Sequence, residues 1–311
     1  MQAPSARRVS LQHDSLSEPA ETWEPPATKR DLDACSTLGR AAYALIPRSL
    51  DAVELPDGAV AELAASVGSL QPGRVILLPR TPRATGKKTW AITPSCVLGI
   101  GQDAVALWAD RADERIVARI RYDEIAAVAD LTVLLFGRLE IVGPETSIVM
   151  RYNMVGRPEI RAALRTVRER FQTGAALAGA PGGPQPDELP HKWMGLLRSG
   201  DLRNVDGTAR VTAAGLLTSA KPLARTGVAV ASAREVMVAT EPDTPGVGGY
   251  GVDLVTMPTA CIRDLSATAT GLRSVIARGA AEVELDLPAH ASLVEAVTAS
   301  ITPAVMAGQG R

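Results

Sequence analysis

Short apolar runs separated by turn residues dominate the chain from Arg74 onward. Seven runs in the first half have the length and the β-branched content of strands: RVILLP, SCVLGIG, AVALWAD, RIVARIRY, LTVLLFG, RLEIVG and SIVMRY. Gly, Pro or Asp residues separate them at intervals typical of an antiparallel meander. The pattern therefore predicts an antiparallel β-structure that ends at residues 156–158.

Helical spacing flanks this meander on both sides. The segment from Pro158 to Phe171 places its large apolar residues on one face, and Pro158 suits a first helical turn. Before the meander, residues 30–45 and 57–67 also carry apolar residues at helical spacing, with Asp57 as a candidate cap. We therefore expect a helical segment before the strands and one amphipathic helix after them.

The second half repeats this outline. Its strand-like runs are VAVAS, REVMVAT, YGVDLVTM, ACIRDLSA, RSVIARG and AEVELDL, and SLVEAVTASI follows them as a terminal helix. Placing Met150 on Leu285 aligns the halves at an offset of about 135 residues, with low identity. We interpret this as divergent duplication; the alternative is that two β-meanders converged on similar composition.

Composition divides the chain into five parts. Residues 1–28 mix Ser, Pro and Glu with few aliphatic residues, which predicts a disordered tail. Residues 174–189 are rich in Gly, Ala and Pro, which is typical of a linker. The helical segment then covers 29–72, the first β-domain covers 73–173, and the second covers 190–305 with HKWMGLLRSG as a short leading helix.

The meander and its closing helix resemble the bacterial pleckstrin-homology-like (PH-like) domain superfamily. The resemblance is carried by TWAITPSCVLGIGQDAVALWAD, VARIRYDEIAAVADL, RLEIVG, SIVMRY and PEIRAALRTVRERF. It covers residues 74–171, and 223–302 more weakly, as an apparent tandem repeat. The resemblance implies a mainly β fold with α-helices: two PH-like antiparallel barrels or sandwiches, each closed by a C-terminal helix, after an N-terminal helical segment.

Charge and cysteine content narrow the classes of function. The 311 residues carry a net charge of −1, so no global field attracts nucleic acid, and we do not expect it as a partner. Cys35, Cys96 and Cys261 lie too far apart for a zinc motif, and their odd number argues against a disulfide framework. No apolar run approaches the length of a membrane span. We expect a cytoplasmic protein, with a position at the periphery of a membrane as the alternative.

The loop between the first two predicted strands carries four cations and no acid: Arg80, Arg83, Lys87 and Lys88. It is not a phosphate-binding P-loop, because Thr81 stands where that motif needs its first glycine. In PH-like domains that bind phosphoinositides, this loop supplies the basic residues. The resemblance therefore implies a candidate site for anionic lipid here; the alternative is a solvated hairpin tip.

A second basic group lies on the helix that closes the first domain. Arg161, Arg165 and Arg168 share its outer face, which is either a solvated face or a surface for an acidic partner or for nucleic-acid phosphates. The absence of interleaved aromatic residues argues against nucleic acid. We take these three arginines as the candidate partner-binding residues.

Two glycine patterns match the residue spacing of the dinucleotide-binding motif. The segment from Gly99 to Ala104 fits its alanine variant, and the segment from Gly246 to Gly251 fits it literally but precedes a strand-like run. A helix over residues 103–115 would support a nucleotide-dependent enzyme. The three histidines are scattered, so we predict no catalytic set, no metal and no cofactor.

These observations favour a non-catalytic interaction or scaffold protein of bacterial PH-like type that binds a protein partner. One alternative is peripheral binding of anionic lipid headgroups through the 80–88 loop. The other is a nucleotide-dependent enzyme that uses the Gly99–Ala104 region. The oligomeric state stays open.

Overall fold

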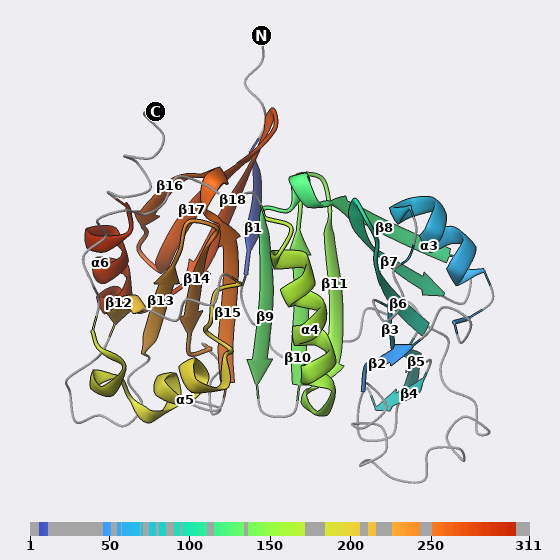
Figure 1. The fold of residues 1–311 in the computed structure, drawn as a ribbon, viewed down its shortest axis with the longest axis horizontal. Coiled ribbons are helices and arrows are strands. Elements are labelled where there is room, and N and C mark those ends of the chain that lie inside the picture. The colour runs from blue at the N-terminus through green and yellow to red at the C-terminus, as the bar shows by residue number, and fades with distance from the viewer. Residues whose placement is uncertain are drawn as a thin grey trace.

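The fold was analysed in a computed structural model. It describes residues 6–11, 46–50, 55–56, 58–68, 70, 75–78, 81–84, 90–93, 95–110, 115–133, 136–171, 184–205, 211–215, 226–242 and 251–302. The predicted helix at 30–45 and residues 174–183 of the predicted linker lie outside these residues. The described chain is mainly antiparallel β-sheet with helices on the sheet faces (Figure 1).

A five-stranded sheet contains early strands of the first half. Its order is β2 (Arg48–Leu50), β3 (Val75–Leu78), β6 (Ser95–Ile100), β7 (Ala104–Asp110) and β8 (Arg115–Arg121). Helix α3 (Ala59–Val67) packs on one face of it and begins after Gly58, one residue beyond the predicted cap. The buried Trp108 donates its indole N–H to Glu62 of α3 over 2.7 Å, which fixes the helix on the sheet.

A seven-stranded sheet joins the two halves of the chain. Its order is β11 (Ser147–Asn153), β10 (Phe136–Val142), β9 (Ala127–Val133), β15 (Gly251–Pro258), β14 (Glu235–Thr240), β13 (Gly227–Ala231) and β12 (Val211–Gly215). Strands β9 and β15 pair antiparallel, with Leu254 opposite Asp130. Three strands of the first half and four of the second therefore form one continuous sheet (Figure 1).

The third sheet closes the second half and includes the N-terminus. Its order is β1 (Arg7–Ser10), β18 (Ala281–Pro288), β17 (Gly271–Arg278) and β16 (Ile262–Ala267). Strand β1 runs parallel to β18. The prediction of a disordered tail over residues 1–28 is therefore wrong for this strand, because Val9 and Leu11 find an apolar core far away in the sequence.

The order of elements is the same in both halves. Leaving aside β1, β2 and the paired strands Thr81–Ala84 and Trp90–Thr93, which occur only in the first half, each half has a helix, four strands, a 3₁₀ turn, three strands and a closing helix. In the first half the turn is η2 (Tyr122–Glu124), and η3 (Met154–Gly156) leads into the closing helix α4 (Arg157–Arg168). In the second half η4 (Pro186–Glu188) precedes the leading helix α5 (His191–Ser199), the turn is η5 (Thr259–Cys261), and α6 (Ala291–Ser300) closes the unit. This repeated order agrees with the alignment of the halves in sequence, and we refer to the halves as repeats 1 and 2.

Each repeat buries an aliphatic core between two sheets and its closing helix. In repeat 1 the core lies among the five-stranded sheet, β9–β11 and α4. In repeat 2 it lies among β12–β15, β16–β18 and α6, and it also takes in side chains from β1. Among the described residues no sheet closes on itself, since every sheet has two different end strands. The repeats are thus pairs of open sheets. They do not form closed barrels, which were one of the two architectures implied by the resemblance.

Charge explains why β15 joins the repeats while its counterpart β8 stays at an edge. Strand β8 precedes η2 as β15 precedes η5, and it carries exposed Arg115, Arg119 and Arg121. Charged side chains on an edge strand disfavour the addition of another strand. Strand β15 is buried along its whole length and has Val252, Leu254 and Thr256 where it pairs with β9.

Candidate functional site

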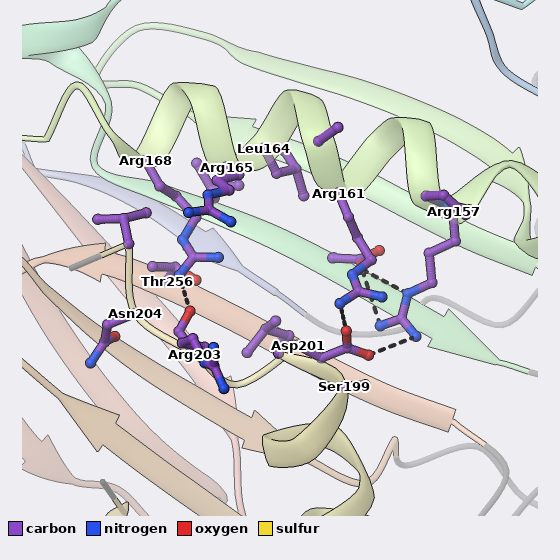
Figure 2. A pocket seen from close by; sticks show the side chains of 17 residues that line it. Arg157, Arg161, Leu164, Arg165, Arg168, Ser199, Asp201, Arg203, Asn204 and Thr256 are labelled. Carbon is purple, nitrogen blue, oxygen red and sulfur yellow. Dashed lines mark hydrogen bonds and ion pairs between the residues drawn. The ribbon is translucent and has the colours of Figure 1, made fainter. Parts of the chain in front are cut away.

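A cleft of about 490 Å³ lies at the junction of the two repeats. Helix α4 forms one wall, and residues 199–205, which follow α5, form the other (Figure 2). Val128 of β9 and Leu254 and Thr256 of β15 line the floor. The cleft therefore exists only because β9 and β15 pair, and it is made from both repeats.

Helix α4 presents four arginines to this cleft at helical spacing: Arg157, Arg161, Arg165 and Arg168. The opposite face of the helix carries Ile160 and Val167, which are fully buried in the core of repeat 1. Amphipathic spacing in the sequence thus fixes which side of the helix faces the cleft. The three predicted partner-binding arginines all line it.

Arg168 is held inside the protein. Its guanidinium donates to both carboxylate oxygens of Glu235, over 2.9 Å from Nε and 2.6 Å from Nη2. The Glu235 side chain is fully buried and also accepts the Val205 backbone N–H over 2.8 Å. Arg168 donates further to the Arg203 carbonyl oxygen over 3.1 Å. This arginine therefore ties α4 to repeat 2, and we assign it a structural role.

Arg161 and Arg157 form a buried network with two aspartates. Arg161 makes an ion pair with Asp201, and Arg157 lies 3.7 Å from Asp201 and 3.3 Å from Asp130. Asp130 also accepts a hydrogen bond from the hydroxyl of the buried Tyr152.

Burial of the network shifts the pKa values of two of its members, Asp130 and Arg161. Burial raises the pKa of Asp130, although the positive charge of Arg157 and the Tyr152 hydrogen bond oppose this shift. Burial, and next the neighbouring Arg157, lower the pKa of Arg161. Because each cation here faces a carboxylate, this part of the cleft is largely compensated in charge.

Two exposed arginines at the opening have N–H groups that can donate further hydrogen bonds. Arg165 is 69% exposed and pairs with Glu169 over 3.2 Å on the same helix. Arg203 is exposed, and within the described chain its guanidinium has no hydrogen bond or ion pair. Five arginines line the cleft against two aspartates, Asp130 and Asp201. The opening can therefore donate charge-assisted hydrogen bonds to a carboxylate or a phosphate.

The sequence indicated the α4 arginines but not their neighbours. Asp201 and Arg203 follow a short helix in a segment without any motif, about 40 residues after the arginines they approach. Asp130 lies in an apolar strand and carries no sequence signal of its own. Asp130 meets α4 within repeat 1, whereas only the pairing of β9 with β15 brings Asp201 and Arg203 to this helix.

The basic 80–88 loop contains a hairpin, as predicted. Strands β4 (Thr81–Ala84) and β5 (Trp90–Thr93) pair antiparallel and form a two-stranded ribbon of their own. Arg83 lies in β4, whereas Arg80, Lys87 and Lys88 lie outside the described residues. The lipid site proposed for these four residues therefore stays a prediction.

The Gly99–Ala104 region does not form a dinucleotide-binding turn. The motif requires a helix after the glycines, but Ala104–Asp110 form strand β7. The glycines instead let α3 approach, because a Cβ on Gly101 would lie 2.4 Å from the Val67 carbonyl oxygen. In the second pattern only Gly251 is described, as the first residue of β15.

Other classes of site find little support in the described part of the chain. It holds no group of three or more His, Cys, Asp or Glu side chains placed to bind a metal. Among the described residues Cys96 and Cys261 form no disulfide, and His290 caps α6 by accepting the Ser292 N–H. No described helix is long and apolar enough to cross a membrane.

Comparison with protein-family models, with curated proteins and with solved structures finds no match to this chain. The site is therefore interpreted from its own geometry.

Proposed function

We propose that this chain is a non-catalytic interaction protein built from two PH-like repeats, and that it binds an acidic segment of a protein partner in the cleft between them. The observation that carries the proposal is the pair of exposed guanidinium groups, Arg165 and Arg203, on opposite walls of the opening. Two open sheets followed by a helix in each half support the PH-like part of the proposal.

The geometry of the cleft favours carboxylates from an extended protein segment. Arg165 and Arg203 belong to separate walls, so a bound segment can contact both at once. The floor of the cleft includes the apolar side chains Val128 and Leu254, which are 2% and 9% exposed. Guanidinium groups are less strongly hydrated than ammonium groups and bind carboxylates through two parallel hydrogen bonds, which suits this surface.

The test is fluorescence anisotropy with a fluorescein-labelled oligoglutamate peptide. Wild-type protein is compared with R165Q/R203Q, which removes both exposed cations of the opening without touching the buried pairs. The matched control is R119Q, which removes one exposed arginine of β8 outside the cleft. Exposed ion pairs contribute about 0.2–1 kcal/mol each, so the double variant should bind roughly 2- to 30-fold more weakly.

Binding should also weaken as salt is raised from low to physiological concentration. Equal affinity of R165Q/R203Q and R119Q would show that the cleft does not hold the peptide. Absence of any binding by wild-type protein to this acidic probe at low salt would overturn the proposed partner chemistry.

A second candidate function is peripheral binding of anionic lipid through the basic hairpin. It is favoured by the β4–β5 ribbon, which pairs with none of the three larger sheets and carries Arg83. Flotation with vesicles containing phosphatidylserine tests it, with wild type compared with a variant in which Arg80, Arg83, Lys87 and Lys88 are all serine. Equal flotation of the two proteins would exclude the hairpin as the lipid site.

A further inference from the structure

Strand β1 is an addition to a repeat that is complete without it. Repeat 2 ends its second sheet with β18, and β1 covers the outer edge of that strand. The corresponding last strand of repeat 1 is β11, and in the described chain it stands at the edge of its sheet with no further strand. Repeat 1 therefore shows that this fold does not require an extra strand at this position.

The edge of β18 holds β1 as a site holds an extended peptide. The two strands run parallel, with Arg8 beside Glu284 and Ser10 beside Asp286, and the Leu11 N–H donates to the Asp286 carbonyl oxygen over 3.1 Å. Addition of a strand to an open sheet edge is a common mode of peptide recognition, in which the backbone supplies affinity and alternate side chains supply specificity.

The alternate side chains of β1 meet two different surfaces. Arg8 donates to Asp286 over 2.7 Å and lies 3.6 Å from Glu284. On the other side Val9 and Leu11 enter the apolar core, where Leu11 is 1% exposed. The acidic pair on β18 therefore selects a basic residue, and the core selects apolar residues one and three positions later.

Repeat 1 contributes the remaining contacts. Arg7 donates to the Gly143 carbonyl oxygen over 2.5 Å and to the Ser147 hydroxyl over 3.0 Å, both at the β10–β11 turn. The occupied edge is thus a slot between the repeats, defined here by Gly143, Ser147, Glu284 and Asp286. None of these four residues lines the arginine cleft at α4.

We propose that this slot is a second peptide-binding site, occupied in this structure by residues 7–11 of the same chain. Its partner is a protein segment that binds as an extended strand, with two basic residues followed by apolar, polar and apolar residues. Such a segment competes with β1 for the β18 edge. Occupation by β1 makes the site self-occluded, so a partner must displace the N-terminal strand.

The test uses a fluorescein-labelled peptide with the sequence Ala-Arg-Arg-Val-Ser-Leu, identical to residues 6–11. In the full-length V9D/L11D protein the tethered strand loses its apolar anchors and the slot opens. This variant should bind the peptide at least about tenfold more tightly than wild type, because the apparent affinity is proportional to the fraction of molecules in which β1 has left the slot. Circular dichroism confirms that the variant is folded.

A charge exchange keeps the proposal testable if V9D/L11D fails to fold. Asp286→Arg in the full chain should weaken the binding of β1 and reverse the charge preference of the slot, so that the wild-type peptide binds roughly fivefold more weakly than a peptide carrying Glu in place of its second arginine. A folded variant that binds neither peptide, or that binds both equally, would overturn the proposal. The outcome is independent of R165Q/R203Q, so failure of this site and failure of the arginine cleft are distinguishable.

Discussion

The Arg168–Glu235 pair gives a direct measure of how strongly the two repeats are joined. Replacing Arg168 by Met keeps an unbranched apolar stem in the helix but removes the charge that faces Glu235. Glu235 then stays fully buried with only the Val205 N–H as a hydrogen-bond donor to its carboxylate. Removing one partner of a buried ion pair costs about 3–5 kcal/mol, because the remaining charge is left uncompensated.

Two further variants separate this cost from general damage to α4. The double variant R168M/E235M removes both charges but leaves the Val205 N–H without its acceptor and the Arg203 carbonyl oxygen without the Arg168 donor. An unsatisfied buried group costs about 1–3 kcal/mol. R165M removes an exposed i,i+4 pair on the same helix, which is worth about 0.3–0.5 kcal/mol. We therefore expect R168M to be the least stable variant, R168M/E235M to recover part of the loss, and R165M to resemble wild type.

Urea unfolding monitored by tryptophan fluorescence and circular dichroism gives the free energy of unfolding of each variant. Trp108 reports on repeat 1 and Trp193 on repeat 2, since each is fully buried in its own repeat. If R168M costs no more than R165M, Glu235 does not depend on Arg168. If R168M/E235M costs the sum of R168M and of E235M measured beside it, the residues are not coupled. Either result would refute the reasoning.

Three other outcomes are expected. Gly101→Ala should destabilise the protein by about 1–3 kcal/mol in urea unfolding, because its Cβ would meet Val67, whereas Gly195→Ala should stabilise it by about 0.5–1 kcal/mol, since helix α5 has open space there. Burial raises the pKa of Asp253 from 3.8 to about 7 against the opposing charge of Lys192. The folded chain then holds a proton that the unfolded chain has released, so thermal stability should fall as pH rises from about 4 to about 7, and D253N should flatten that slope. Because β9 and β15 share a sheet, unfolding followed in Trp108→Phe and Trp193→Phe variants should give coincident midpoints; separate transitions would contradict a joined core.

Much of the secondary structure could be predicted because its signals are local. The helix Arg157–Arg168 has an apolar face and a proline in its first turn, and the structure confirms it with a start one residue earlier and an end three residues earlier than predicted. Strand β9 begins at Ala127, four residues before the predicted run at Leu131, because small alanines carry a weak strand signal yet pack well in a crowded junction. Strand β1 was missed because its partner β18 is remote in sequence. Strand β12 was missed although it pairs with the next strand, because Ala and Gly make up three of its five residues and carry little strand signal.

The candidate site could also be predicted only in part. The sequence placed Arg161, Arg165 and Arg168 on one helix face, but it gave them one shared role. The structure separates them: Arg168 is committed to a buried carboxylate, Arg161 pairs with Asp201, and Arg165 stays at the opening. Ion pairing depends on which acids other segments bring close, and that information is absent from the spacing of arginines along a helix.

The sequence by itself determined the two strand-and-helix units, their order and the amphipathic face of each closing helix, because these follow from periodicities of two and 3.6 residues within one segment. The tertiary structure decided that β15 rather than β8 extends a sheet across the repeats, that the N-terminal strand docks on β18, and that the arginines of α4 meet repeat 2. The two strand pairings join backbone groups more than 100 residues apart, and the α4 arginines find their partners in the other repeat. No local pattern in the sequence specifies these pairings.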